Sequence, residues 1–242
     1  MRRLALALLL AAAGPAAARG KSPSGAGVVI LDGVRTPVRW NDGDSFRIEA
    51  GPRKGERTRL EGVNALETFG PAHRWGGWRP EELLAIAKAA GPRAASEPWR
   101  CTTAGARDAH RRLLVSCPEL ALALVREGLA MVFAVDAPAD PALVAAQRAA
   151  QGVQAGMWAK GVPPRIVSSA HSADEADLDR RGAYDRVVDT WTGAAVPRRH
   201  VHVYRACEWV CAGEGERQSC FLYVPYERRY RHKPWCLRGE RP

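Results

Sequence analysis

Acidic residues and arginines that suit phosphate chemistry lie in four short segments of this chain. The segments are Asp42–Phe46, Arg59–Thr68, Asp108–Val115 and Leu124–Ala130. Carboxylate and amide oxygens bind hard cations such as Ca²⁺, and guanidinium groups hold phosphate oxygens in a fork of donors. Each segment alone is more typical of a turn, a solvated strand face or a weak surface salt bridge. The chemistry therefore depends on whether the fold brings the segments together.

The elements expected around these segments are short strands and three helices. Apolar and β-branched stretches predict strands near residues 28–31, 38–40, 45–49, 57–63, 99–102, 113–117 and 129–135. First-turn prolines and apolar periodicity predict helices that begin at Pro80, Pro118 and Pro141. Gly91-Pro92 is expected to stop or bend the first helix, and Gly128 to end the second. This order predicts an α+β fold with a barrel-like sheet and segregated helices.

Taken in order, the four segments resemble the staphylococcal nuclease (thermonuclease) family over about residues 27 to 160. The family motifs are D-G-D-[ST], R-L-x-x-[VI]-[DN]-x-P-E, D-x-Y-G-R and L-V-x-x-G-L-A. The matching stretches here are DGDS, RLEGVNALE, DAHRR and LVREGLA. The resemblance implies a five-stranded OB-fold β-barrel with three helices. It also implies a Ca²⁺-dependent nuclease that cuts DNA or RNA to 5′-hydroxyl and 3′-phosphate products.

The resemblance assigns a metal site and a water-activating group. Asp44, Asn64 and the backbone carbonyl of Ala65 match the Ca²⁺ ligands, which are all hard oxygen donors. Glu67 matches the glutamate that orients or deprotonates the attacking water. Asn64 stands where a second carboxylate is common, so we expect a weaker Ca²⁺ site. Leu66 replaces a proline before Glu67, which predicts a less restrained loop.

The resemblance also assigns phosphate-binding groups. Arg59 and Arg112 match the two arginines that stabilise the charge developing on phosphorus. His110 takes the place of a tyrosine near the phosphate, and Arg111 replaces a glycine.

The stretch 131–136 lacks the tyrosines that often line the family's nucleotide pocket. Trp75 and Trp78 could replace them, although a barrel-capping role is the favoured interpretation. These departures leave a second hypothesis, a catalytically weakened OB-fold module that binds nucleic acid or protein.

The amino-terminal residues 1–18 have the layout of a secretory signal peptide. Arg2 and Arg3 precede an apolar run at 4–13, and Ala16–Ala18 offers small residues for cleavage. The run is too short to span a bilayer. We therefore expect an exported monomer, secreted or in the periplasm or cell envelope. Its formal net charge of +10 favours DNA or RNA as a partner, although such a charge can also serve solubility alone.

The six cysteines predict three disulfides in an exported chain. Cys101 and Cys117 lie near the ends of two expected strands, which predicts that they pair. The remaining four are Cys207, Cys211, Cys220 and Cys236. Two disulfides of open connectivity are the favoured interpretation of these four, and a zinc site is the alternative.

The remainder of the chain divides into a linker at 161–199 and a cysteine-rich module at 200–242. The linker assignment rests on polar composition and an acidic run at Asp174–Asp179. The module carries interleaved arginines and tyrosines at 223–231. Such a pattern is equally typical of nucleic-acid binding and of a solvated hairpin.

Overall fold

The computed structural model describes residues 25–175 and 182–238. The predicted signal peptide lies outside the described residues. Within these described ranges, fourteen short strands and five α-helices make up a mixed α+β structure. No described helix has the length and apolar composition needed to cross a bilayer.

The first half of the chain contains nine strands and three helices. The strands are β1 (Ala26–Leu31), β2 (Val34–Trp40), β3 (Phe46–Ile48), β4 (Thr58–Leu60), β5 (Val63–Ala65), β6 (His73–Trp75), β7 (Trp99–Cys101), β8 (Leu113–Val115) and β9 (Ala130–Val132). The helices are α1 (Pro80–Ala95), α2 (Pro118–Arg126) and α3 (Pro141–Gly152), and a 3₁₀ turn, η1 (Gly156–Trp158), follows.

All three helices begin at the predicted prolines. Gly91-Pro92 does not stop α1, which continues to Ala95. Pro92 lies in the last turn, where it removes one i→i−4 hydrogen bond without ending the helix. The buried Gly91 also lies against the backbone of Asp42, with an added Cβ meeting the Asp42 carbonyl oxygen at 3.7 Å.

The strands of the first half form separate sheets. One has the order β3-β2-β1-β7, and β4-β8 and β5-β9 are two-stranded pairs. Isolated bridges join Arg47 to Arg57 and Thr102 to Ser116, so single contacts link the first sheet to both strands of the β4-β8 pair. The described strands make no closed barrel, so the predicted five-stranded OB barrel is not confirmed.

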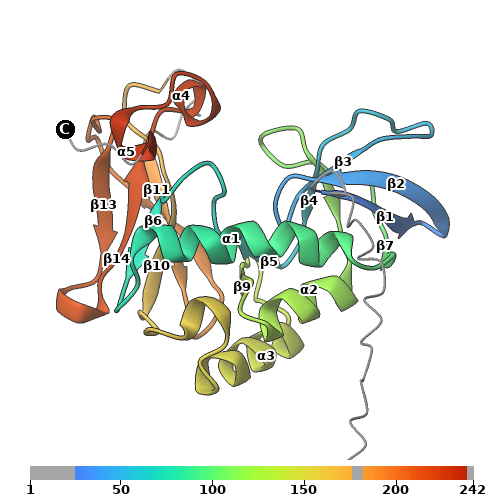
Figure 1. Cartoon of the computed structure of the whole chain (residues 1–242), viewed down its shortest axis with the longest axis horizontal. Helices are drawn as coiled ribbons and strands as arrows, with labels where there is room; N and C mark the ends of the chain where they lie inside the picture. Colours follow the sequence, from blue (N-terminus) through green and yellow to red (C-terminus); the bar gives the residue numbers. More distant parts are fainter. Residues whose placement is uncertain (1–24, 176–181, 239–242) are drawn as a thin grey trace, which may run out of the picture.

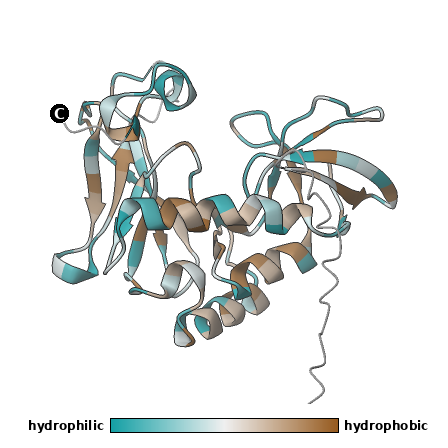
Figure 2. Cartoon of the chain, viewed as in Figure 1, coloured by the Kyte–Doolittle hydropathy of each residue, from teal (hydrophilic) through white to brown (hydrophobic). Residues whose placement is uncertain are grey.

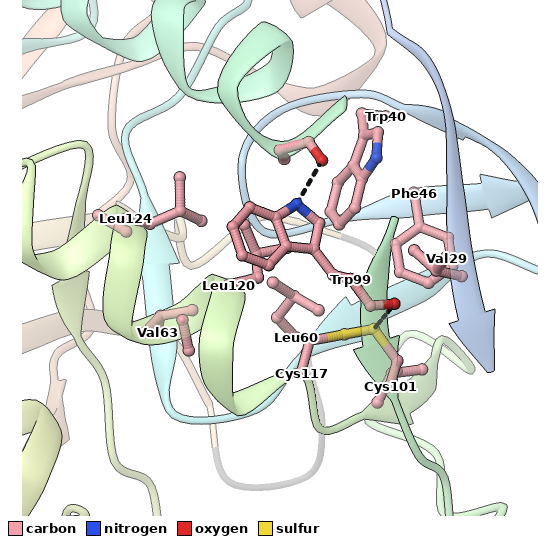
Figure 3. Close-up of a cluster of buried hydrophobic side chains, with 14 of the residues drawn as sticks. Val29, Trp40, Phe46, Leu60, Val63, Trp99, Cys101, Cys117, Leu120 and Leu124 are labelled. Atoms are coloured by element: carbon pink, nitrogen blue, oxygen red, sulfur yellow. Dashed lines mark hydrogen bonds between the residues drawn. A yellow bond between two sulfur atoms is a disulfide. The ribbon is translucent and has the colours of Figure 1, made fainter. Parts of the chain in front are cut away.

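One apolar core lies under these sheets and is covered by α2 (Figure 3). The rings of Trp40 and Phe46 meet edge to face at 4.8 Å. Trp99 donates its indole N–H to the Ala94 carbonyl at 2.8 Å. The predicted Cys101–Cys117 disulfide is present at the edge of this core. An isolated antiparallel bridge between Thr102 and Ser116 places the two cysteines side by side, although the strands before them have other ladder partners: β7 pairs with β1 and β8 with β4, both in parallel.

The predicted linker at 161–199 is wrong. This segment contains β10 (Arg165–Ala170), β11 (Tyr184–Asp189) and β12 (Ala195–Arg199), which form one antiparallel sheet. Ile166, Val167, Val187 and Val188 are buried there. Polar residues surround these apolar pairs, so the sequence showed no clear strand pattern there.

The cysteine-rich segment continues this second half of the molecule. It forms β13 (Glu208–Ala212), a 3₁₀ turn η2 (Gly215–Arg217), β14 (Ser219–Tyr223), α4 (Tyr226–Tyr230) and α5 (Trp235–Arg238). Disulfides join Cys207 to Cys236 and Cys211 to Cys220, which decides the open connectivity and excludes the zinc alternative. Its buried residues share a core with β10 and β11, so it is not a separate module.

The two halves are joined by α1 and by a shared sheet. In Figure 1, α1 runs from the sheets of the second half to those of the first. β14 pairs antiparallel with β6, placing the last strand of the chain beside a strand from the first half. Hydrophobic residues are frequent on α2, whereas α4 is mostly hydrophilic (Figure 2).

Candidate functional site

The Asp42–Ser45 turn presents Asp44 to two strands at once. The backbone carbonyl of Asp44 accepts a hydrogen bond from Leu60 of β4 at 2.8 Å. Its side-chain Oδ2 accepts from the backbone N–H of Ala65 of β5 at 2.5 Å. Asp44 is only 2% exposed, so this carboxylate is fixed inside the protein.

Close packing against α1 explains the glycine of this turn. A Cβ on Gly43 would lie 2.6 Å from the Cβ of Ala90, which real side chains do not tolerate. Asp42 then closes the turn, because its Oδ1 accepts from the backbone N–H of Asp44 and from the Ser45 hydroxyl. Asp42 is thus a turn-forming group beside Asp44.

Arg59 lies at the centre of the candidate ligand set. Its guanidinium forms a 2.6 Å ion pair with Asp44 Oδ1 and donates to Asn64 Oδ1, also at 2.6 Å. The Asn64 amide in turn donates to the carbonyl of Ala65 at 2.8 Å. The structure therefore brings together Asp44, Arg59, Asn64 and Ala65, as predicted from their order in the sequence.

This arrangement bears on whether the site suits Ca²⁺. One carboxylate, one amide oxygen and one backbone carbonyl form the kind of donor set that Ca²⁺ takes. Two of these oxygens already converge on a single cationic group, the guanidinium of Arg59. The donor chemistry fits a hard cation, and Ca²⁺ would compete with Arg59 for Asp44 and Asn64.

Arg112 comes to the same side of the β4-β8 pair as Arg59. Thr58, Leu60, Leu113 and Val115 are buried, so the alternate positions face away from the core. Arg59 is in register with Leu114, and Arg112 lies two residues before Leu114 on that outer face.

Asp108 holds the Arg112 side chain. Its Oδ2 accepts from Arg112 Nε at 2.7 Å, and its Oδ1 accepts from the Arg112 backbone N–H at 2.8 Å. Arg111, at the position of the family's glycine, has a left-handed backbone with φ of 60°. His110 is exposed and binds through its backbone only, to Asp108 and Arg57. Within the part of the chain that the structure describes, the His110 side chain makes no hydrogen bond at this site.

Glu67 follows β5 in the loop that leads to β6. Burial raises the pKa of Glu67, and the charges of Arg229, Asp44, Arg59 and Arg112 act on it in decreasing order, the arginines lowering the pKa and Asp44 raising it. Such charge effects require short distances. Glu67 therefore belongs to the same electrostatic group as the other predicted residues.

His73 anchors the Glu67 loop in place of the absent proline. Burial lowers the pKa of His73 to about 3, so its imidazole is neutral. Its Nε2 accepts the backbone N–H of Glu67 at 3.3 Å, and Leu66 is buried at 1% exposure. The loop is thus fixed by packing and a hydrogen bond, contrary to the expectation of a less restrained loop.

The two tryptophans considered as replacements for the absent tyrosines are structural. Trp75 is 2% exposed, and Trp78 donates its indole N–H to the Met157 carbonyl at 2.9 Å. Both rings lie at the second core, which is separate from the core under the first-half sheets, so a barrel-capping role stays a prediction. Trp75 is buried, and Trp78 is half-buried.

Sequence reasoning missed His73 and Arg229 as neighbours of Glu67. His73 had no local signal, because its contact depends on how the loop folds back. The interleaved arginines and tyrosines of the tail indicated a basic and aromatic segment that includes Arg229, but they did not predict its position near Glu67.

Comparison with known proteins gives no family for the chain, since neither a family model nor a curated protein matches it.

Proposed function

We propose that this protein is a Ca²⁺-dependent nuclease of the thermonuclease type, built on an OB-like barrel. One observation carries the proposal. A buried aspartate and an amide oxygen bind the guanidinium of Arg59 directly, and the charges of Asp44, Arg59 and Arg112 act on Glu67, although these residues come from distant segments. The motif resemblance and the bridges linking the first sheet to the β4-β8 pair support the same fold.

The proposed reaction is hydrolysis of a phosphodiester. Glu67 orients a water molecule and accepts one of its protons while the water oxygen bonds to phosphorus. The bond from phosphorus to O5′ breaks, and O5′ takes a proton from solvent, leaving a 5′-hydroxyl and a 3′-phosphate. Arg59 and Arg112 donate to the phosphoryl oxygens as their negative charge grows.

Ca²⁺ would be held by Asp44, Asn64 and the carbonyl of Ala65, and when bound it supplies positive charge against the phosphate. Asp108 keeps Arg112 in one orientation through its two hydrogen bonds. A positioned guanidinium loses less side-chain entropy on meeting the phosphate.

The test is digestion of single-stranded DNA with Ca²⁺ and with EDTA. We expect cleavage with Ca²⁺ only, and Arg112→Ala to reduce turnover by about 100- to 1000-fold. Arg35→Ala is the matched control, because Arg35 is exposed on β2, away from this group. Equal cleavage in both buffers, no cleavage at high enzyme concentration, or near-normal turnover of Arg112→Ala would reject the proposal.

A second candidate is a nucleic-acid-binding module without catalysis. It is favoured by the hydrogen bonds that already engage Asp44, Asn64 and the Ala65 carbonyl within the protein. Retention of DNA without cleavage, with a steep dependence on salt, would support this candidate instead.

A further inference from the structure

The short helix α4 lies against the loop that carries Glu67. The ring of Tyr230 is 6.5 Å from that of Phe69, two residues after Glu67. The guanidinium of Arg229 lies 4.9 Å from the centre of the same Phe69 ring. A segment near the end of the chain thus reaches the candidate catalytic loop.

Contacts beyond α4 hold this segment in place. Lys233 donates its ammonium to the Phe69 carbonyl at 2.8 Å. Leu237 packs so tightly on Gly70 that a Cβ there would lie 2.4 Å from a Leu237 methyl. The Cys207–Cys236 disulfide ties the neighbouring residue to the β13 side of the sheet. The position of α4 is therefore set by packing and a covalent link.

Arg229 places an additional positive charge beside Glu67. Its Nε donates to the Val224 carbonyl at 3.0 Å, which orients the guanidinium. No carboxylate within residues 25–175 and 182–238 forms a salt bridge with Arg229. Among the arginines near Glu67, its charge has the largest effect on that carboxylate. A phosphate at this place would meet a cation that has no competing ion pair there.

Two tyrosines flank this cation and are open to solvent. Tyr226 is 69% exposed and Tyr230 is 61% exposed, with ring centres 6.5 Å apart. Partial burial of the hydroxyl raises the pKa of Tyr230, and the charges of Glu67 and Asp42 raise it further. Much of the Tyr230 ring therefore remains available for stacking.

We propose that Tyr226, Arg229 and Tyr230 form a strand-binding wall for single-stranded nucleic acid beside Glu67. Arg229 binds a backbone phosphate, and the two tyrosines stack on unpaired bases. This inference rests on the proposed function, because it places the strand at the same group.

The choice of a single strand follows from the chemistry of the wall. Aromatic rings stack on bases only where the bases are unpaired, and a guanidinium between such rings suits the phosphate that links them. Loss of one stacking ring is expected to weaken binding by about 5- to 100-fold.

The experiment measures binding apart from cleavage. The full mature chain is titrated into a fluorescently labelled eight-nucleotide single strand in EDTA, and anisotropy gives Kd. We expect Tyr226→Ala/Tyr230→Ala, which removes two rings, to raise Kd by about 30-fold or more, and Tyr226→Phe/Tyr230→Phe to stay within about twofold of wild type, because stacking needs only the ring. An equal Kd for Tyr226→Ala/Tyr230→Ala and wild type would refute the proposed strand-binding wall.

Arg229→Gln tests the phosphate contact, with Arg228→Gln as the control. Both residues lie in α4 and lose the same charge, but only Arg229 acts on Glu67. We expect Arg229→Gln to lower the slope of log Kd against log salt by about 0.7, the value for one phosphate contact on a single strand. An equal change in Arg228→Gln would mean general attraction and would overturn the assignment of Arg229.

The two proposals fail in different ways. If wild type does not cut DNA while the tyrosine variants bind less tightly, the nuclease proposal fails and the wall stands. If wild type cuts DNA and the tyrosine variants bind and cut as wild type does, the wall fails alone. A melting temperature equal to that of wild type in each variant would show that weaker binding does not result from unfolding.

Discussion

The ion pair of Asp44 and Arg59 should be a large contributor to stability when no Ca²⁺ is bound. Their side chains are 3% and 14% exposed, and the pair measures 2.6 Å. Asp44→Asn leaves the guanidinium of Arg59 buried without its counter-charge, and removal of one member of a buried pair costs about 3–5 kcal/mol. Arg59 keeps its hydrogen bonds to Val63 and Asn64, so we expect the lower end of that range.

Urea unfolding in EDTA at pH 7, followed by tryptophan fluorescence, measures this loss. With a slope of about 2 kcal/mol per molar urea, the midpoint should fall by about 1.5 M. Glu49→Gln is the control, because Glu49 pairs with Arg39 at 3.4 Å and both are well exposed. Exposed pairs contribute at most about 1 kcal/mol.

The double variant Asp44→Asn/Arg59→Met also removes the guanidinium that Asp44→Asn alone leaves without a counter-charge. It should be more stable than Asp44→Asn alone, because the uncompensated guanidinium is gone. A midpoint for Asp44→Asn within about 0.3 M of wild type would refute the view that this buried pair supports the site.

Three further predictions follow from the same region. Asn64→Asp should tighten Ca²⁺ binding, because it adds a charged oxygen ligand next to Asp44; unchanged or weaker affinity in a calorimetric titration would count against Asn64 as a ligand. Arg111→Gly should raise the unfolding free energy by up to about 1 kcal/mol, since its φ of 60° suits glycine; a lower melting temperature would contradict this. Desolvation acts to raise the pKa of Asp108, but hydrogen bonds and the charge of Arg112 hold it below its usual value. Because the folded pKa is depressed, the stability that the Asp108 carboxylate contributes is present above its unfolded pKa of about 4 and is lost as pH falls further. The stability gap between wild type and Asp108→Asn should thus be full at pH 6 and shrink below pH 4 in urea titrations; a gap that does not change with pH would contradict the pairing.

The sequence was informative where local signals decide structure. First-turn prolines correctly predicted where α1, α2 and α3 begin, because proline suits the first turn whatever surrounds it. The Cys101–Cys117 pair was also predicted correctly, although the strands that carry it pair with other partners. Local patterns thus predicted where helices and strands lie in the sequence better than they predicted which strands pair.

Long-range packing accounts for what the sequence did not reveal. β10, β11 and β12 were assigned to a linker, because their burial depends on distant residues: one face packs with the second core of the first half and the other with β13 and β14. The pairing of β14 with β6 joins strands far apart in the chain, and no local pattern specifies its register.

The β6–β14 pairing also has a consequence for biosynthesis. The loop that holds Glu67 leaves the ribosome long before Tyr226–Leu237, which supply its packing contacts at Phe69 and Gly70. A nascent chain therefore carries this loop without its packing contacts until residues 226–237 have been translated and Cys207 has been oxidised with Cys236. The Glu67 loop thus reaches its full packing only after a segment synthesised much later has folded against it.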